Sequence, residues 1–340
     1  MPHVLLTWFA TPEEVRRVRA GLPKGTTVAA PKVRASLSRF ETKESDLAHL
    51  SGKADALMGW TVPPTIWDKT PRLKALAWLH AGCDELDFAM LKRRGVKVAN
   101  IRGGNGIAVA EHAMALMLAS AKRIVERHNW LLEARWQPIF HPDFRGTLLE
   151  GKTLAVVGLG EIGTAVARRA KSFDMTVLGI RRHAKRSGRF ADEVHGPEAL
   201  HRVLKRADFV VLAAPLTPET EGLIDAKALA AMKRGAHLIN IARGNMIVEA
   251  DLHAALAAGR LGGYASDVWW NYTNSFPATY HFPIISRTGV QRFPRVTGTG
   301  DQASSVDSIV EKEIRMGTES LAAFFKGRPM PRQIDLDLGY

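Results

Sequence analysis

A glycine-rich turn between a buried strand and a helix constrains this chain more than any other feature. Residues 154–163 read Leu-Ala-Val-Val-Gly-Leu-Gly-Glu-Ile-Gly, and a helix-forming stretch, Thr164 to Phe173, follows them. In such a turn Gly158 permits the tight bend, Gly160 lets a pyrophosphate approach the backbone, and Gly163 lets the helix pack on the strand. Free N–H groups at the helix start would face the phosphates, so the turn predicts a dinucleotide site. Its predicted contact residues are Gly158, Gly160, Glu161, Ile162 and Gly163.

The end of the next predicted strand, Thr176 to Ile180, indicates which dinucleotide is bound. In NAD sites an acid at this point bonds the ribose 2′-hydroxyl. Here Arg181 and Arg182 stand in its place, 18 residues after Gly163. Their guanidinium groups suit a 2′-phosphate, although a solvated basic loop is the alternative interpretation. We therefore predict that NADP(H) is favoured, with NAD(H) as the second choice.

Size and composition are those of a two-domain globular protein. The chain has 340 residues, more than one hydrophobic core usually organises. Its apolar runs are only strand-length, no export signal is recognisable, and the single Cys83 excludes an internal disulfide. We therefore expect a cytoplasmic protein without a membrane segment. The net charge of +13 is spread along the chain without a nucleic-acid motif, which favours small anionic ligands over nucleic acid.

Predicted strands alternate with amphipathic helices, the pattern of a doubly wound α/β fold. The expected strands are Val4–Trp8, Ala54–Met58, Leu73–Ala77, Val96–Ala99, Thr176–Ile180, Phe209–Leu212, His237–Ile241 and Gly263–Asp267. The expected helices include Pro12–Ala20 near the start of the chain. A long apolar helix, Ile107–Arg127, is expected to be buried between domains or subunits. The last helix, Ser304–Lys326, is expected to return to the first domain.

Further motifs follow one another in a single order between about residue 50 and residue 326. They are Ala81-Gly82-Cys83-Asp84, Val109-Ala-Glu111-His112, Trp136, Leu149-Glu-Gly-Lys152, the glycine turn, Ala207-Asp208, Pro215-Leu-Thr217-Pro-Glu-Thr220 and Asn240-Ile-Ala-Arg243-Gly244. With these motifs the chain resembles the D-isomer-specific 2-hydroxyacid dehydrogenases. The resemblance implies two Rossmann-like or flavodoxin-like doubly wound α/β domains with a cleft between them. It places a substrate-binding domain at 1–103 plus 297–340 and an NAD(P)-binding domain at 104–296. It also implies a homodimer formed through the helix near residues 105 to 145.

The same resemblance assigns roles to individual residues. It implies that backbone amides near Ala81 and Gly82, next to His80, hold a substrate carboxylate. It also implies that Arg243 grips the carboxylate and carbonyl oxygens. An arginine suits this task because its planar pair of donors polarises a carbonyl as hydride arrives. Further implied cofactor contacts are Pro215, Thr220, Ile241, Ala242, Arg243 and Asp267.

Two positions depart from the family pattern. Family members use a histidine as proton donor, within Thr-Pro-His-x-Gly, and a glutamate that raises its basicity. If Ala303-Ser304 aligns with the family's Ala-Thr, the histidine position holds Thr299. The glutamate position, five residues after Asp267, holds Tyr272. Neither side chain titrates usefully near neutral pH, and losing a general acid costs about 10² to 10⁴ in rate. Non-standard acid-base residues are therefore expected.

An added segment, Tyr272 to Arg292, is the first place to look for the missing proton donor. Long loops without structure of their own are often functional, and this one carries titratable and aromatic groups. We predict His281 as the donor, with Tyr280 second. Since a lone histidine among aromatics is more often a packing residue, His80 is kept as the rival. His112, on the long apolar helix, is expected to be structural.

Together these features predict an NADP(H)-dependent oxidoreductase that acts on a 2-hydroxy acid, a 2-oxo acid or a similar anion. The alternative is a binding protein that senses the dinucleotide or serves as a scaffold. Retention of Arg243 favours the enzyme, because a sensor has no need of a carbonyl-polarising group. No His, Cys and Asp cluster has the spacing of metal ligands, so no metal is expected.

Overall fold

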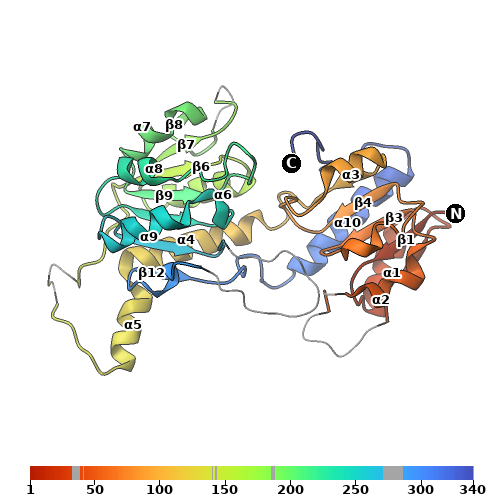
Figure 1. The fold of residues 1–340 in the computed structure, drawn as a ribbon, viewed down its shortest axis with the longest axis horizontal. Helices are drawn as coiled ribbons and strands as arrows, with labels where there is room; N and C mark the ends of the chain where they lie inside the picture. Colours follow the sequence, from red (N-terminus) through yellow and green to blue (C-terminus); the bar gives the residue numbers. More distant parts are fainter. Residues whose placement is uncertain are drawn as a thin grey trace. The chain divides into compact units, whose positions relative to one another are not determined.

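The computed structural model describes residues 1–32, 39–40, 42–139, 141, 144–184, 188–270 and 286–339. These residues form two compact units, each built around its own parallel sheet (Figure 1). The first unit takes in both ends of the chain, up to Asn105 and from Asp307 onward. The second takes in the middle, from Gly106 to Val306. The expected α/β class with two doubly wound units is confirmed.

The first unit contains a five-stranded sheet in the order β2-β1-β3-β4-β5. Its strands are β1 (His3–Leu6), β2 (Thr27–Ala29), β3 (Ala56–Gly59), β4 (Ala75–Trp78) and β5 (Lys97–Ala99). Its helices are α1 (Pro12–Gly21), α2 (Glu44–Ser51), α3 (Phe88–Arg93) and α10 (Ile309–Phe325), with a short 3₁₀ turn at Pro64–Ile66. Helix α10 packs on α1 and β4, so the last helix returns to the first unit as expected.

The second unit contains a seven-stranded parallel sheet in the order β12-β11-β10-β9-β6-β7-β8. Its strands are β6 (Thr153–Val157), β7 (Thr176–Ile180), β8 (Glu193–His195), β9 (Phe209–Leu212), β10 (His237–Asn240), β11 (Gly263–Ser266) and β12 (Val296–Gly298). Its helices are α4 (Gly106–Lys122), α5 (Ile124–Leu132), α6 (Glu161–Lys171), α7 (Leu200–Leu204), α8 (Ala226–Ala231) and α9 (Glu249–Ala257). Short 3₁₀ turns lie at Pro197–Ala199, Gly244–Met246 and Val290–Arg292. The strand order reverses between β6 and β9, which is where a doubly wound fold binds its ligand.

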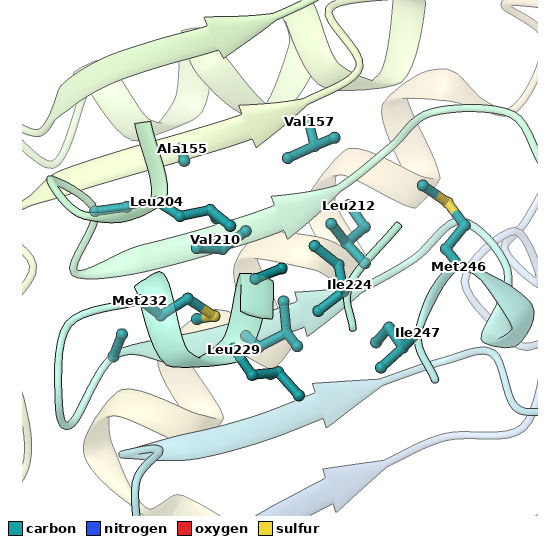
Figure 2. Packing of buried hydrophobic residues seen from close by; sticks show 14 of the residues in the cluster. Ala155, Val157, Leu204, Val210, Leu212, Ile224, Leu229, Met232, Met246 and Ile247 are labelled. Carbon is teal, nitrogen blue, oxygen red and sulfur yellow. The ribbon is translucent and has the colours of Figure 1, made fainter. Parts of the chain in front are cut away.

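Both faces of this sheet are buried, which explains its continuous apolar strands. Side chains of successive strand residues point to opposite faces. On one face Val210 and Leu212 of β9 meet Leu229 of α8, together with Ala155 of β6 (Figure 2). On the other face, alternate residues such as Val211 pack against α4 and α6.

The prediction of one long apolar helix over residues 107–127 is wrong in one respect. The helix ends at Lys122, because Arg123 adopts a left-handed backbone with φ 54°, and α5 begins at Ile124. The Arg123 guanidinium pairs with Glu126 at 2.6 Å and lies 5.2 Å from the Trp130 ring. Helix α4 is buried along most of its length, whereas no residue of α5 is buried within the chain.

The point at which the chain returns from the second unit to the first also lies later in the sequence than predicted. Strand β12 adds to the edge of the larger sheet, with Tyr264 opposite Val296 and Ser266 opposite Gly298. Residues 297 to 306 therefore belong to the second unit, and the first unit resumes at Asp307. Within the described part of the chain, no helix has both the length and the apolar character needed to cross a bilayer.

Candidate functional site

The glycine turn joins β6 to α6 at the reversal of strand order. Gly158 has φ 104°, and a Cβ built on it would lie 2.5 Å from the Ala214 nitrogen of the neighbouring loop. A Cβ on Gly163 would lie 1.9 Å from the Gly158 oxygen. Around Gly160, in contrast, no described atom lies within 4 Å of a built Cβ. Two glycines are thus required by packing, and the third leaves open space beside the backbone.

The start of α6 faces that open space. Gly160 is the N-cap residue of this 11-residue helix and provides no side-chain cap. The first backbone N–H groups of a helix have no partner within the helix. An anionic group placed beside Gly160 and Glu161 would therefore meet free donors and the positive end of the helix dipole. These residues fit the pyrophosphate of a dinucleotide.

The two arginines at the end of β7 differ in their contacts. Arg181 continues the strand pairing by donating its N–H to the His195 oxygen at 3.0 Å. Within the described residues its guanidinium makes no hydrogen bond or ion pair. Arg182 is exposed, and its Nη2 lies 3.7 Å from the carboxylate of Glu219. The pKa of that carboxyl is lowered, first by the hydrogen bond that the Thr217 hydroxyl donates to it.

The loop after β9 forms a tight turn beside the glycine turn. The Ala213 N–H donates to the Val157 oxygen at 2.8 Å, which joins the two loops at their start. Farther on, Thr220 Oγ1 accepts from the Thr217 N–H at 2.8 Å and donates to the Pro215 oxygen at 2.7 Å. Pro215 and Thr220, both predicted cofactor contacts, thus share one turn at the carboxyl edge of the sheet.

Arg243 is held after β10 by a fully buried asparagine. Asn240 Nδ2 donates to the Arg243 oxygen at 2.9 Å, and Asn240 Oδ1 accepts from the Ala242 N–H at 3.1 Å. Ile241 and Ala242 are buried beneath this turn. Gly244 is needed there, because a Cβ on it would lie 2.2 Å from the Trp269 carbonyl carbon. The Arg243 side chain is therefore carried by a rigid turn at the end of the strand.

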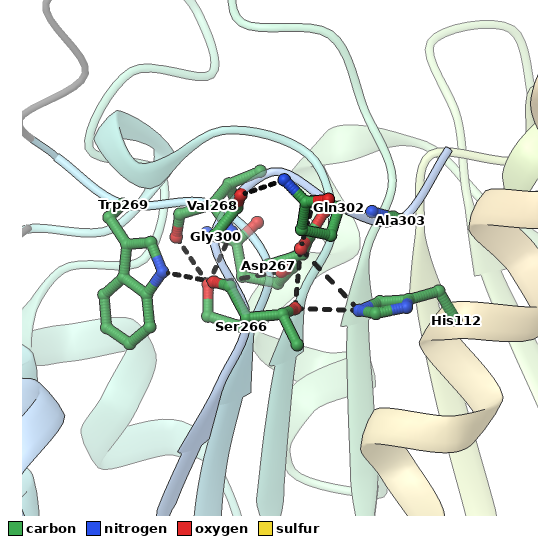
Figure 3. A network of polar contacts seen from close by, with 10 residues as sticks. His112, Ser266, Asp267, Val268, Trp269, Gly300, Gln302 and Ala303 are labelled. Atoms are coloured by element: carbon green, nitrogen blue, oxygen red, sulfur yellow. Dashed lines mark hydrogen bonds and ion pairs between the residues drawn. The ribbon is translucent and has the colours of Figure 1, made fainter. Parts of the chain in front are cut away.

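Asp267, after β11, organises the loop that follows β12 (Figure 3). Its carboxylate is almost fully buried. Its Oδ1 accepts from Thr299 Oγ1 at 2.6 Å and from the Gln302 N–H at 2.9 Å. Its Oδ2 accepts from the Ala303 N–H at 2.9 Å. The structure shows this organising role, and the predicted cofactor contact of Asp267 stays a prediction.

The same network contains a histidine that the sequence analysis treated as structural. His112, on α4, places Nε2 2.8 Å from Thr299 Oγ1 and 3.7 Å from Asp267 Oδ1 (Figure 3). His112 and Thr299 are 187 residues apart in the sequence. The one available signal was that His112 lies in a recognised motif and that Thr299 was singled out as a departure from the family pattern, and nothing in the sequence indicates that they touch.

Asp301 is a second residue that the sequence analysis missed. Its N–H donates to the Asp267 backbone oxygen at 2.8 Å, and its own backbone is left-handed with φ 56°. Asp301 as a whole is exposed, although protein atoms surround its carboxyl group. Burial and, second, the negative charge of Asp267 raise the pKa of this carboxyl, while the charge of Arg243 lowers it. The loops after β10, β11 and β12 therefore form one electrostatic cluster.

The predicted substrate-carboxylate loop lies in the first unit. After β4, the Gly82 oxygen accepts from Trp78 Nε1 at 3.0 Å, and the Ala81 oxygen accepts from Asn100 Nδ2 at 2.7 Å. The His80 ring lies 5.3 Å from the Trp78 ring. These bonds fix the loop, while its contact with a carboxylate stays a prediction.

The predicted proton donors are not placed by the structure. His281 and Tyr280 lie outside the described residues, as does Tyr272 at the family's glutamate position. Their roles remain predictions. Among the described residues, no group of three or more His, Cys, Asp or Glu side chains is arranged to hold a metal ion.

Comparison of the sequence with known families and proteins agrees with this geometry. Residues 114–299 match the NAD binding domain of the D-isomer specific 2-hydroxyacid dehydrogenases. A glyoxylate reductase of Korarchaeum cryptofilum is 32% identical over 293 residues, which cover 84% of this chain and 83% of that relative. A D-3-phosphoglycerate dehydrogenase of Methanocaldococcus jannaschii is 35% identical over 231 residues, and these cover 67% of this chain but only 43% of that enzyme.

Solved structures share the whole fold. The TT0316 protein from Thermus thermophilus has a TM-score of 0.76 at 30% identity, covering 98% of this chain and 100% of that one. An NADPH-dependent glyoxylate/hydroxypyruvate reductase from Sinorhizobium meliloti, in complex with NADP and malonate, has a TM-score of 0.76 at 23% identity, covering 99% and 98%. This second likeness concerns the fold alone. The chain therefore belongs to the D-isomer specific 2-hydroxyacid dehydrogenase family of NAD(P)-dependent oxidoreductases.

Proposed function

We propose that this protein is an NADP(H)-dependent reductase of small 2-oxo acids, acting reversibly on the matching 2-hydroxy acids. The observation that carries the proposal is the placement of Arg243 on a rigid turn in the same unit, and at the same sheet edge, as the glycine turn. A bound nicotinamide cofactor would supply the hydride. The residues of the chain would bind and orient the cofactor and the substrate, and they would polarise the substrate carbonyl.

Binding of the pyrophosphate is assigned to the glycine turn and the start of α6. Selection of NADP(H) over NAD(H) is assigned to Arg181 and Arg182. Two observations support this assignment. No acid stands at the end of β7, and the Arg181 guanidinium makes no hydrogen bond or ion pair among the described residues. Arg182 would exchange its contact with Glu219 for the 2′-phosphate, because a charge-assisted bond to a phosphate is the stronger of the two.

Arg243 is assigned to the substrate. Its guanidinium would donate to one carboxylate oxygen and to the carbonyl oxygen of a 2-oxo acid, which stabilises negative charge as it develops on the carbonyl. The amides near Ala81 and Gly82 would hold the other carboxylate oxygen. Glyoxylate is the first probe, since similar proteins are named glyoxylate reductases.

The second candidate function is a dinucleotide-binding sensor or scaffold. It is favoured if Ala303-Ser304 aligns with the family's Ala-Thr, because Thr299 would then stand at the position of the family's proton-donating histidine. A sensor would bind NADPH with a measurable dissociation constant and reduce none of the probes.

We also propose that two copies associate through α5 and the segment after it. Apolar side chains there are unusually exposed, including Leu132 at 73% and Trp136 at 77%. They adjoin a hollow of about 510 Å³ whose lining includes Trp130, Ile139 and Phe144. A second copy is the expected occupant, because the resemblance implies dimerisation through this region. Light scattering should give a dimer for the unaltered protein and a monomer for Leu132→Glu; a monomer in both cases would contradict the proposal.

The decisive test of the function is turnover by the purified protein. NADPH oxidation would be followed with glyoxylate, hydroxypyruvate and pyruvate, and the hydroxy acid product would be identified and its chirality determined. Reduction of at least one probe to the D-hydroxy acid, or to glycolate from glyoxylate, is expected. Tight NADPH binding without any reduction would favour the sensor instead.

A further inference from the structure

The loop after β4, residues 80–83, turns two successive carbonyl groups toward the interior of the first unit. The Ala81 oxygen accepts a hydrogen bond from Asn100 Nδ2 at 2.7 Å, and both groups are held close to the end of β5. The Gly82 oxygen accepts one from Trp78 Nε1 at 3.0 Å. We propose that Asn100 and Trp78 are positioning residues, which hold this loop so that its backbone amides bind a substrate carboxylate. This inference rests on the proposed function and names the side chains that orient the loop.

The direction of the loop's N–H groups follows from the planar peptide bond. In a trans peptide the carbonyl oxygen and the N–H of the next residue point in opposite directions. The Ala81 oxygen points to Asn100, which is only 4% exposed, so the Gly82 N–H points away from the interior. In the preceding peptide the His80 oxygen accepts from the Ile101 N–H at 3.2 Å. The Ala81 N–H therefore points away from Ile101, which is buried as well.

These two amides have no acceptor within the described part of the chain. Neither the Ala81 N–H nor the Gly82 N–H donates to a backbone or side-chain atom there. Both residues are partly exposed, so an anion can reach them from solvent. A partly buried N–H without a protein acceptor is completed by water or by a ligand. Two neighbouring donors suit a carboxylate, because a charged acceptor strengthens each hydrogen bond.

The Asn100 side chain is fixed because both ends of its amide are used. Its Nδ2 donates to the Ala81 oxygen and to Cys83 Sγ, the latter at 3.4 Å. Its Oδ1 accepts from the Arg102 N–H at 3.2 Å. An amide turned by 180° would place its oxygen against the Ala81 oxygen and its protons against the Arg102 N–H. Only one orientation of the amide therefore satisfies its neighbours, and that orientation holds the loop.

The backbone of Asn100 is held by the last residues of the chain. Strand β5 lies at the edge of the five-stranded sheet, where its outer backbone groups need partners. The Asn100 N–H donates to the Arg332 oxygen at 3.3 Å, and the Ile334 N–H donates to the Val98 oxygen at 2.8 Å. The C-terminal segment thus pairs with the end of β5 in antiparallel fashion. Asn100 is therefore fixed through its backbone as well as through its side chain.

A loop held in this way should act on substrate binding more than on the chemical step. Amides that are already in place need no ordering when the carboxylate arrives, so less of the binding free energy is lost. The carboxylate itself does not change during the reaction. A group that binds it equally in the substrate and in the transition state affects KM and leaves kcat nearly unchanged. Loosening the loop should therefore raise KM.

The test compares variants that each remove one contact of the loop. Asn100→Asp keeps the volume and the acceptor for Arg102 but removes the donor to the Ala81 oxygen. Trp78→Phe removes the indole N–H and keeps an aromatic ring. In each variant the KM for glyoxylate at saturating NADPH should rise about tenfold or more, and kcat should fall less than about threefold. Trp67→Phe should change neither constant, because the Trp67 indole N–H has no acceptor among the described residues.

Binding of oxalate separates a positioning role from a general loss of structure. Oxalate carries carboxylate groups and is not reduced by NADPH, so its dissociation constant reports binding alone. Measured by calorimetry with NADPH bound, this constant should rise about tenfold in Asn100→Asp and in Trp78→Phe. NADPH affinity should stay within about twofold in both, because the glycine turn belongs to the second unit, which has a core of its own. Should Asn100→Asp fail to fold, Trp78→Phe decides.

Two results would overturn the positioning role. One is an unchanged KM for glyoxylate together with unchanged oxalate affinity in the variants of Asn100 and Trp78. The other is a large fall in kcat at unchanged KM, which would assign the effect to the reacting carbonyl. An unaltered protein that binds NADPH yet reduces no probe would contradict the proposed function instead. The oxalate affinities of the variants would then still decide whether these residues position a carboxylate-binding loop.

Discussion

Gly244 and Trp269 approach each other so closely that the carbonyl carbon of Trp269 lies 2.2 Å from the place where a Cβ on residue 244 would stand. The contact is between backbones, so no side-chain rotation can relieve it. It locks the turn after β10 against the end of β11. The residue carried by that turn is Arg243, and the residue two positions before Trp269 is Asp267.

Gly244→Ala should therefore destabilise the second unit and displace Arg243. Overpacking at a backbone contact costs about 1 to 3 kcal/mol in well-packed interiors. Urea denaturation would give the loss of stability, and glyoxylate reduction would fall with it. Gly52→Ala, after α2, where the backbone has φ −60° and a Cβ would meet no described atom within 4 Å, serves as a comparison for the general cost of replacing a glycine. Equal stability of Gly244→Ala and the unaltered protein would show that the turn adapts.

Gly160→Ala should spare the fold and weaken cofactor binding. The backbone at this N-cap has φ −85°, which alanine adopts without strain, and the space beside it is open. A methyl group there would stand where the pyrophosphate is expected to approach. NADPH affinity, measured by fluorescence, should fall at least about tenfold while the midpoint of thermal unfolding stays the same. Unchanged NADPH affinity would show that the pyrophosphate does not bind at this turn.

The double change Arg181→Asp, Arg182→Ala should reverse the cofactor preference. Without the guanidinium groups the 2′-phosphate of NADPH would face a carboxylate, whereas the 2′-hydroxyl of NADH would gain an acceptor. The ratio of the two dissociation constants measures the effect. Equal dissociation constants for NADPH and NADH in the unaltered protein would contradict the predicted preference directly.

Arg243→Lys should fail almost as badly as Arg243→Ala in turnover, with cofactor binding and folding intact. An ammonium group cannot make the two-pronged contact with carboxylate and carbonyl oxygens. Losing a preorganised donor of this kind costs about 10² to 10³ in kcat. The matched control is Arg202→Ala, an exposed residue of α7. Near-full activity of Arg243→Ala on the eventual substrate would rule out the assigned role.

Glu313, buried on α10, should make the stability of the protein fall as the pH rises. Its carboxyl accepts from Trp60 Nε1 at 2.8 Å, and burial raises its pKa from 4.5 to about 7. The folded state thus holds a proton that the unfolded state releases. The stabilisation is complete below about pH 4.5 and is lost as the pH rises through about 7, with a total on the order of a few kcal/mol.

Glu313→Gln keeps an acceptor for Trp60 without a charge, so it should remove this pH dependence. Free energies of unfolding at about pH 5 and about pH 8 would measure it. At the higher pH the variant should be the more stable protein. The comparison is Glu311→Gln, an exposed residue of the same helix, whose ion pair with Arg17 is expected to contribute little. The same pH slope in Glu313→Gln and the unaltered protein would assign the effect to other groups.

Local patterns in the sequence were sufficient for the fold class and the dinucleotide turn. Gly158, Gly160 and Gly163 are diagnostic because their task depends on backbone geometry within a few residues. The apolar run Leu154 to Val157 identifies a buried strand because both faces of a parallel sheet are covered. Strand and helix types follow from such short-range periodicity, and the strands β7 and β9 match the expected ranges.

Tertiary structure decided what depends on residues far apart in the chain. Strand β12 joins the larger sheet because β11 offers it a free edge, and the break at Arg123 is stabilised by Glu126 and Trp130. The meeting of His112, Thr299 and Asp267 depends on where α4 and β12 pack on one sheet, and no local spacing encodes it. Sequence motifs can draw attention to single residues, but only the packed fold brings the His112 imidazole to the Thr299 hydroxyl.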